Sequence, residues 1–210
     1  SAKSAEPTPS VFVLLADTKF MVFLVFSFLF CIPLALYFTY ANAFIASRGV
    51  ANPEAIMTIG QYSEIVFLLL LPFAFNYLTA KRALLVGMAF WALRYAIFAK
   101  SGNTEWMLIT GVALHGLCYD FFFVTGYMYT EKKAGENIKN AAQGLFTFAT
   151  YGVGMFIGTN YSGFVVEQNK LADATGHNWT SIWLTPAAIA GAVLIAFILF
   201  FKEKKEVEAA

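Results

Sequence analysis

Long apolar stretches with almost no charged residue determine what this chain can fold into. A helix needs about 20 apolar residues to cross the hydrocarbon core of a bilayer. Six stretches come close to this length or exceed it, and the only charged residues inside them are Glu64, Arg94 and Asp120. The stretches are residues 20–47, 55–80, 83–99, 106–130, 140–166 and 180–201. The sequence therefore predicts an all-α integral membrane protein with six transmembrane helices.

The composition agrees with an exterior that faces lipid. Charged residues make up 13% of the chain, against roughly 25% in soluble domains. Aromatic residues reach 18%, which suits a surface in contact with a bilayer. No segment alternates apolar and polar residues at period two, so strands are not expected. The formal net charge of +1 gives no reason to expect a nucleic-acid partner.

Motifs for catalysis, nucleotide binding and metal binding are missing from the sequence. There is no G-x-x-x-x-G-K-[ST], no G-x-S-x-G and no H-E-x-x-H. Cys31 and Cys118 lie inside apolar stretches without metal-ligand spacing, which favours a role as small core residues. His115 and Cys118 are three residues apart, but two residues do not make a metal site. We therefore expect no enzyme, no metal and no cofactor.

The distribution of Lys and Arg predicts the orientation. Six crossings place both termini on one side of the membrane, and cytoplasmic loops carry an excess of positive residues. Ten positive residues fall on the side of the termini and three on the other, namely Lys3, Lys19, Lys81, Arg82, Lys132, Lys133, Lys139, Lys202, Lys204 and Lys205 against Arg48, Lys100 and Lys170. Both termini are expected in the cytoplasm. The opening, with Pro7 and Pro9 and no initiator Met, indicates a loop or linker rather than a signal peptide.

Two carboxylates near the middle of predicted helices are candidate functional groups. A charge at the bilayer centre costs at least about 2.5 to 3.5 kcal/mol, so Glu64 and Asp120 are expected to hold a proton for part of a cycle or to face a wet cavity. Gln61 lies one turn before Glu64 on the same face. Tyr119 precedes Asp120, and Phe123 lies on the same face as Asp120. The alternative is a structural hydrogen bond between helices.

The first predicted helix adds polar and aromatic side chains. It carries Tyr37, Tyr40 and Asn42, and Pro33 is expected to kink it. Carboxylates and amides suit a substrate rich in hydroxyl groups, and aromatic rings suit a flat ring that can stack on them. For the tyrosines alone, packing or an interfacial belt is the competing explanation.

Other features of these stretches indicate structure. Arg94 lies toward the outer end of its helix, where it is expected to reach the interface or to pair with a backbone carbonyl. Gly154 and Gly158 form a G-x-x-x-G pattern, which predicts a face for close helix packing.

Several motifs together resemble the nucleoside:proton symporter family of the major facilitator superfamily. They are Trp-Ala-Leu-Arg-Tyr at 91–95, the run from His115 to Tyr129 with its Tyr-Asp pair, Glu-Lys-Lys-Ala at 131–134 with Ala-Ala-Gln-Gly at 141–144, and Gln-Tyr-Ser-Glu at 61–64. The similarity extends from about Lys19 to Lys202.

The resemblance implies a fold of twelve helices in two six-helix halves around a central cavity. This chain resembles the second half, so its stretches correspond to helices seven to twelve. Residues 1–19 are then the end of the central cytoplasmic loop, residues 20–201 the membrane half and residues 202–210 a cytoplasmic tail. The N-terminal half is the implied partner, and the bacterial inner membrane the implied location.

The resemblance also implies roles for particular residues. Gln61, Glu64, Tyr119 and Asp120 are expected to bind nucleoside or to carry the proton, with Asp120 the first choice for coupling and Glu64 the second. The segment from Tyr40 to Asn42 is similar to the family, whereas apolar Ala35 and Phe38 stand where polar residues are expected. The alternatives are a proton-coupled facilitator for sugars or polyols, and a membrane packing module without transport of its own.

Overall fold

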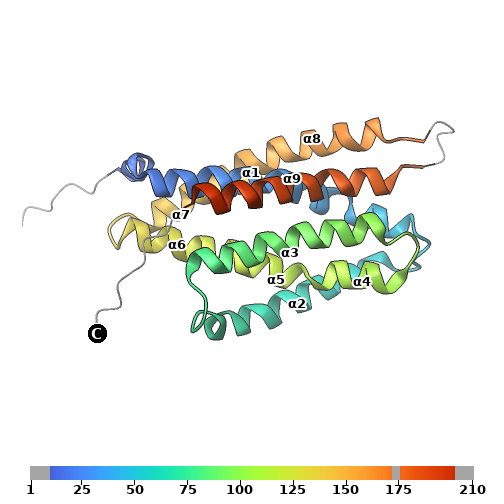
Figure 1. Ribbon diagram of the computed structural model, residues 1–210, viewed down its shortest axis with the longest axis horizontal. Coiled ribbons are helices and arrows are strands. Elements are labelled where there is room, and N and C mark those ends of the chain that lie inside the picture. Colours follow the sequence, from blue (N-terminus) through green and yellow to red (C-terminus); the bar gives the residue numbers. More distant parts are fainter. Residues whose placement is uncertain (1–9, 172–175, 202–210) are drawn as a thin grey trace, which may run out of the picture.

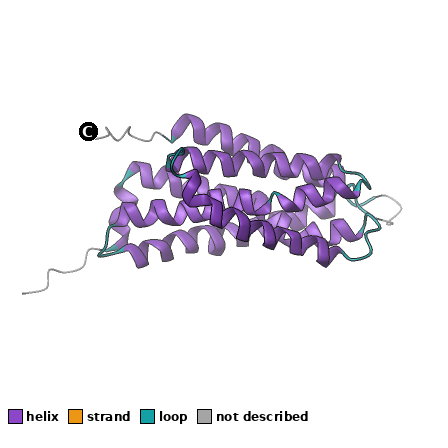
Figure 2. Cartoon of the chain, turned by 90° about the horizontal axis from the view of Figure 1, so that it is seen from below, coloured by secondary structure: helices purple, strands orange, loops and turns teal. Residues whose placement is uncertain are grey.

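The computed structural model describes residues 10–171 and 176–201 of the chain. Within these residues the fold is helical, and the backbone pairs in β fashion only at an isolated bridge between Lys170 and His177 (Figure 2). The elements are η1 (Val11–Ala16), α1 (Thr18–Ala46), α2 (Pro53–Ala74), α3 (Ala80–Lys100), α4 (Glu105–Ala113), α5 (His115–Tyr119), η2 (Asp120–Val124), α6 (Thr125–Ala134), α7 (Lys139–Thr147), η3 (Phe148–Gly154), α8 (Met155–Gln168) and α9 (Trp179–Phe200). η1 is a 3₁₀ helix, and η2 and η3 are π-helical.

These elements form six rods that run back and forth along the long axis of the molecule (Figure 1). The fourth rod joins α4, α5, η2 and α6, and the fifth joins α7, η3 and α8. Five rods are long and apolar enough to cross a membrane. The fifth rod is not among these five, because Gly, Thr, Tyr and Asn residues dilute its apolar ones. The prediction of an all-α, six-helix membrane fold is confirmed.

Local side-chain caps determine where the rods begin. The Asp17 carboxylate accepts hydrogen bonds from the backbone N–H groups of Lys19 and Phe20 at 2.8 and 3.1 Å, which starts α1. The Thr79 hydroxyl accepts from the backbone of α3 in the same way. The predicted end of the second stretch at Ala80 is therefore wrong. The second helix ends at Ala74, and Ala80 already belongs to α3.

Close packing between α1 and the fifth rod depends on the predicted glycine pair. A Cβ atom added at Gly154 would lie 2.9 Å from the Cβ of Cys31, and one at Gly158 would lie 2.7 Å from the Cβ of Ala35. Real side chains do not approach so closely, so only glycine lets these helices touch. The prediction that the G-x-x-x-G pattern forms a packing face is confirmed.

The six rods differ in how much of their surface is buried against the other rods. Of the residues in the most apolar part of each helix, 61% are buried in α1 but only 17% in α2. Large apolar side chains of α2 remain exposed, among them Ile65, Leu69 and Phe73. α2 therefore presents a broad apolar face outside this bundle.

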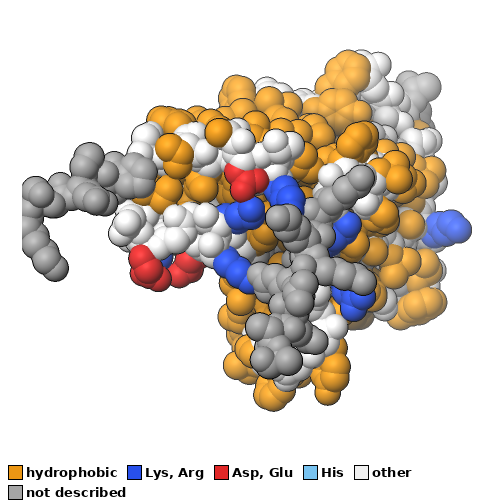
Figure 3. All heavy atoms as spheres, turned by 60° about the vertical axis from the view of Figure 1, so that its left-hand side comes forward, with side chains coloured by type: hydrophobic (Ala, Val, Ile, Leu, Met, Phe, Trp, Pro, Cys, Tyr) orange, Lys and Arg blue, Asp and Glu red, His pale blue; other side chains and the backbone are white. Residues whose placement is uncertain are grey.

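At the end of the bundle that faces the viewer in Figure 3, Lys and Arg side chains gather with a few acidic ones, while hydrophobic side chains cover the sides in view. At this end the Lys133 ammonium group pairs with the Asp17 carboxylate at 2.7 Å, tying the end of α6 to the start of α1. The hydrogen bond from Lys133 lowers the pKa of Asp17 below its usual value. The predicted positive residues Lys3, Lys202, Lys204 and Lys205, and most of the predicted terminal segments, lie outside the described residues.

Candidate functional site

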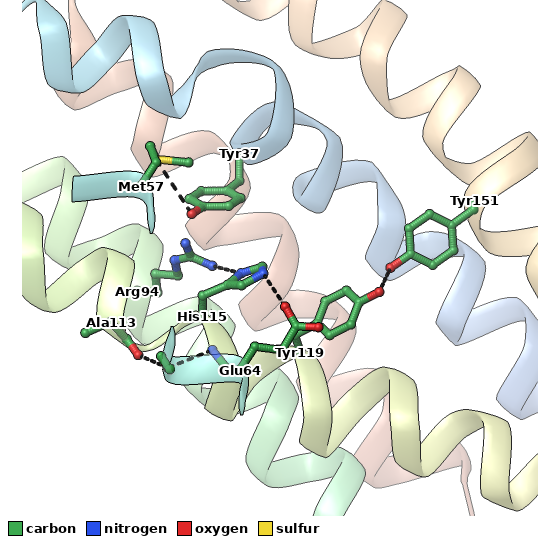
Figure 4. A network of polar contacts seen from close by, with 10 residues as sticks. Tyr37, Met57, Glu64, Arg94, Ala113, His115, Tyr119 and Tyr151 are labelled. Carbon is green, nitrogen blue, oxygen red and sulfur yellow. Dashed lines mark hydrogen bonds and ion pairs between the residues drawn. The ribbon is translucent and has the colours of Figure 1, made fainter. Parts of the chain in front are cut away.

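Three side chains from three rods meet within the bundle, two of them buried and the third partly exposed (Figure 4). Nη1 of Arg94, on α3, lies 3.0 Å from Nδ1 of His115, which begins α5. Nε2 of the same imidazole lies 3.8 Å from a carboxylate oxygen of Glu64 on α2. The imidazole therefore lies between a guanidinium group and a carboxylate. We call Arg94, His115 and Glu64 the interior polar row.

A tight contact between α2 and α5 sets the position of Glu64. The Ser63 hydroxyl donates a hydrogen bond to the carbonyl of Ala113 and accepts one from the backbone N–H of Gly116 at 3.0 Å. A Cβ atom at Gly116 would collide with the backbone of Ser63 and Glu64. Glycine at this position thus permits the approach that places Glu64 beside His115.

Arg94 is held by an aromatic ring and an imidazole rather than by an acid. Its side chain is completely buried, and its guanidinium carbon lies 3.5 Å from the centroid of the Tyr37 ring. This is a close cation–π contact. Its Nε and Nη2 atoms have no hydrogen-bond partner among the described residues. The expectation that Arg94 reaches the interface or pairs with a carbonyl is therefore wrong.

A second polar contact continues the site toward the fifth rod. The Tyr151 hydroxyl, in η3, donates a hydrogen bond of 2.7 Å to the hydroxyl of Tyr119. The Tyr119 ring lies 5.4 Å from the ring of His115 and 5.0 Å from that of Phe123, between centroids. Tyr119 directly precedes η2, so two π-helical segments meet here. Such segments occur frequently at functional sites.

Asp120 opens η2 and is almost completely buried, with 1% of its surface exposed. Neither carboxylate oxygen has a hydrogen-bond partner in the described part of the chain. An ionised carboxylate is costly to bury without a partner, so Asp120 is an unusual group among the described residues.

The remaining predicted site residues occupy different places. Gln61 is exposed on α2, and Phe123 is buried against Tyr151, with ring centroids 5.1 Å apart. Tyr40 directs its hydroxyl toward Gly163 on α8. Asn42 donates a hydrogen bond of 3.3 Å to Glu54, near the start of α2. Among the described residues, no hydrogen bond joins Tyr40 or Asn42 to the interior polar row.

Tyr37 contributes to the site through its ring. Its ring plane stacks 5.6 Å from the His115 ring, between centroids, and its hydroxyl donates to the sulfur of Met57 at 3.9 Å. No group of three His, Cys, Asp or Glu side chains that could hold a metal ion occurs within residues 10–171 and 176–201.

Three residues of the site were not predicted as its members from the sequence: Arg94, His115 and Tyr151. Arg94 is one of the three charged residues inside apolar stretches, and His115 is one of two histidines in the chain. Both could have been flagged because ionisable groups in a membrane helix are functional candidates by default. Tyr151 gives no comparable signal, because a single tyrosine is common in such helices.

The chain is similar to known proteins over most of its length. The sequence model described as "Nucleoside H+ symporter" matches residues 7–206. The putative nucleoside transporter YegT of Escherichia coli is 37% identical over 199 residues, which cover 91% of this chain and 47% of YegT. The nucleoside permease NupG of Escherichia coli is 30% identical over 92% of this chain and 49% of NupG.

A solved structure gives the same result. The crystal structure of the nucleoside transporter NupG superimposes with a TM-score of 0.82 at 28% identity, over 95% of this chain and 54% of that chain. The chain therefore spans about half the length of the relatives it matches.

Proposed function

Because the chain belongs to the nucleoside H+ symporter family, we propose that it forms one six-helix half of a proton-coupled nucleoside carrier. The observation that carries this proposal is a pair of acidic residues on two helices at the site. Glu64 lies 3.8 Å from the imidazole of His115, and Asp120 is buried and directly follows Tyr119 in the chain. A transported nucleoside offers hydroxyl groups for a carboxylate and a flat base for aromatic rings.

Glu64 and Gln61 are the groups we assign to the sugar hydroxyls. A carboxylate accepts hydrogen bonds from two hydroxyl groups, and an amide both donates and accepts. The Glu64 side chain is 39% exposed, so a ligand can reach it. Tyr119 supplies a hydroxyl from the neighbouring helix. Tyr37 and Phe123 are buried behind these groups, where they pack against the rings of His115 and Tyr151.

Asp120 is the group we assign to proton coupling, with Glu64 as the second candidate. Asp120 is buried without a partner in the described chain, whereas Glu64 faces an imidazole. A carboxyl group that gains or loses charge in a membrane interior changes the free energy of the state that buries it. Protonation of Asp120 can therefore favour one of the two access states of a carrier.

The other half of the carrier is the partner we assign to the exposed face of α2. Carriers of this type place their substrate between two repeats that rock against each other. Residues 20–201 form the membrane half in this assignment, residues 1–19 end the central loop and residues 202–210 form the tail. The end of the bundle that is rich in Lys and Arg would lie in the cytoplasm of a bacterium, with the protein in the inner membrane.

The test is uptake by the full-length carrier, reconstituted in liposomes with an inward proton gradient. We expect accumulation of labelled uridine, abolished by a protonophore, and little accumulation of a labelled sugar under the same gradient. Accumulation of the sugar instead would favour the facilitator alternative. Absence of uptake of either would favour a packing module.

A further inference from the structure

We propose that Arg94 is a positioning residue that holds His115 in the tautomer with its proton on Nε2, so that the ring presents this N–H group to Glu64. The tautomer follows from the contacts of the interior polar row alone. Its consequence for substrate binding rests on the proposed function.

The geometry leaves one arrangement of protons on the imidazole. The guanidinium group of Arg94 has five N–H donors and no acceptor. Its Nη1 lies 3.0 Å from Nδ1 of His115, which is hydrogen-bond distance. A hydrogen bond here requires Nδ1 to accept, so the proton of a neutral ring is on Nε2. An imidazolium ion would instead set two N–H groups and two positive charges against each other.

Arg94 has little freedom to leave this position. Its guanidinium carbon lies over the Tyr37 ring at 3.5 Å from the centroid, and the Trp91 and Phe98 rings lie at 5.6 and 5.7 Å. No salt bridge joins Arg94 to an acid in the described part of the chain, and its only hydrogen bond there is to His115. The buried guanidinium group has this single polar contact in the described chain. It therefore holds His115 in position, instead of forming an ion pair that would stabilise the fold.

The tautomer of His115 affects Glu64, which lies on α2. Nε2 lies 3.8 Å from a carboxylate oxygen of Glu64, which is slightly beyond hydrogen-bond distance. An N–H group aimed at this oxygen attracts it and leaves the second oxygen available to a ligand hydroxyl. The other tautomer would aim a lone pair at the carboxylate and repel it. Arg94 thus acts on the substrate-binding carboxylate through the imidazole.

The first measurement is the tautomer of His115 in the full-length carrier, read from the ¹⁵N shifts of its labelled imidazole by solid-state NMR. The signal lost in His115→Asn identifies the residue. We expect protonated Nε2 and unprotonated Nδ1. A proton on Nδ1 of the wild-type protein would overturn the proposal, and this measurement needs no folded Arg94 variant.

The second measurement compares variants of Arg94, which is buried, and Arg48, which is half-buried. Both arginines lie over an aromatic ring. Arg94→Met should raise the fraction of the tautomer with its proton on Nδ1, since only Glu64 then favours a proton on Nε2, whereas Arg94→Lys should keep the wild-type tautomer because an ammonium group only donates. Arg48→Met is the matched control. Arg48 lies over the Phe44 ring at 5.0 Å, and no hydrogen bond joins it to a histidine among the described residues. An unchanged tautomer in Arg94→Met would overturn the proposal.

Uridine binding then tests the link to substrate. Loss of a contact that involves a charged group should weaken the Kd about tenfold in Arg94→Met, with most of the affinity retained in Arg94→Lys. Wild-type affinity in Arg94→Met with mixed tautomers would overturn the link to Glu64. Absence of uridine binding in the wild-type carrier would overturn the proposed function but leave the tautomer assignment standing.

Discussion

The hydroxyl of Tyr151 donates a hydrogen bond of 2.7 Å to the hydroxyl of Tyr119. Because the Tyr119 oxygen accepts this bond, its own proton remains available for another acceptor. The contact joins η3 of the fifth rod to the start of η2 in the fourth. It therefore links the helix that carries Asp120 to a neighbouring rod at the level of the site.

Replacing Tyr151 by Phe should weaken nucleoside binding by the full-length carrier. The ring remains, but Tyr119 loses the donor that orients its hydroxyl. One neutral hydrogen bond contributes about 1 kcal/mol, so the Kd for uridine should rise about fivefold, as measured by isothermal titration calorimetry.

Tyr127→Phe is the control for this experiment. It removes a comparable hydrogen bond of 2.9 Å between Tyr127 and Thr147, two turns further along the fourth rod. Equal effects of Tyr151→Phe and Tyr127→Phe on the Kd would show that the hydrogen bond to Tyr119 contributes no more to uridine binding than the control hydrogen bond does.

Gly116→Ala should separate α2 from α5. The new methyl group has no room against the backbone of Ser63 and Glu64, so α2 must shift and carry Glu64 away from His115. Overpacking of this kind costs about 1 to 3 kcal/mol. We expect a lower melting temperature in detergent and weaker uridine binding.

Gly191→Ala provides the matched control, because a Cβ atom at Gly191 on α9 meets nothing within 4 Å. This substitution should leave both the melting temperature and the affinity near the wild-type values. A melting temperature of Gly116→Ala equal to that of Gly191→Ala would contradict the tight contact between α2 and α5.

Glu64→Gln should reduce substrate affinity even when no proton gradient is applied. The amide replaces one acceptor oxygen by a donor, so it reproduces only part of the pairing with two hydroxyl groups. We expect the Kd for uridine to rise about tenfold or more, since bonds to a charged acceptor contribute about 1.5 to 3 kcal/mol. Glu54→Gln, near the start of the same helix, is the control. An unchanged Kd in Glu64→Gln would remove this residue from the binding site.

This six-helix half alone should not catalyse coupled transport. A cavity between two halves needs both walls, and the apolar face of α2 with Ile65, Leu69 and Phe73 is largely uncovered here. Liposomes that contain only this chain should accumulate no uridine under a proton gradient. Accumulation at the rate of the full-length carrier would refute this expectation, and cross-linking would then show whether a second copy supplies the missing wall.

The sequence predicted the helical architecture well because the bilayer imposes a simple rule. A charge-free stretch must form a helix that satisfies its own backbone, and the six predicted stretches coincide with the six rods. The turn between α2 and α3 was placed too late, because apolar residues continue through it. Only the cap at Thr79 marks the change, and a hydropathy pattern does not register a single hydroxyl group.

The candidate site was only partly predictable, for a different reason. Glu64 and Asp120 stand out because acids are costly in a membrane. The partner of each side chain depends on how the rods rotate and pack. No pattern along one helix shows that Arg94 meets His115 across 21 positions, or that Tyr151 meets Tyr119 across 32. Tyr40, in contrast, was predicted as a site residue from its place on α1, but its hydroxyl points toward α8, and among the described residues no hydrogen bond joins it to the interior polar row.

The most direct test of proton-coupled nucleoside transport is uphill uptake by the Asp120→Asn variant of the full-length carrier. The amide mimics the protonated acid permanently, so the variant should still bind uridine and exchange it across the membrane. In liposomes with an inward proton gradient, the wild-type carrier should accumulate labelled uridine and Asp120→Asn should only equilibrate it. If Asp120→Asn still accumulates uridine against its gradient, and does so only when the proton gradient is present, then Asp120 is not the coupling group.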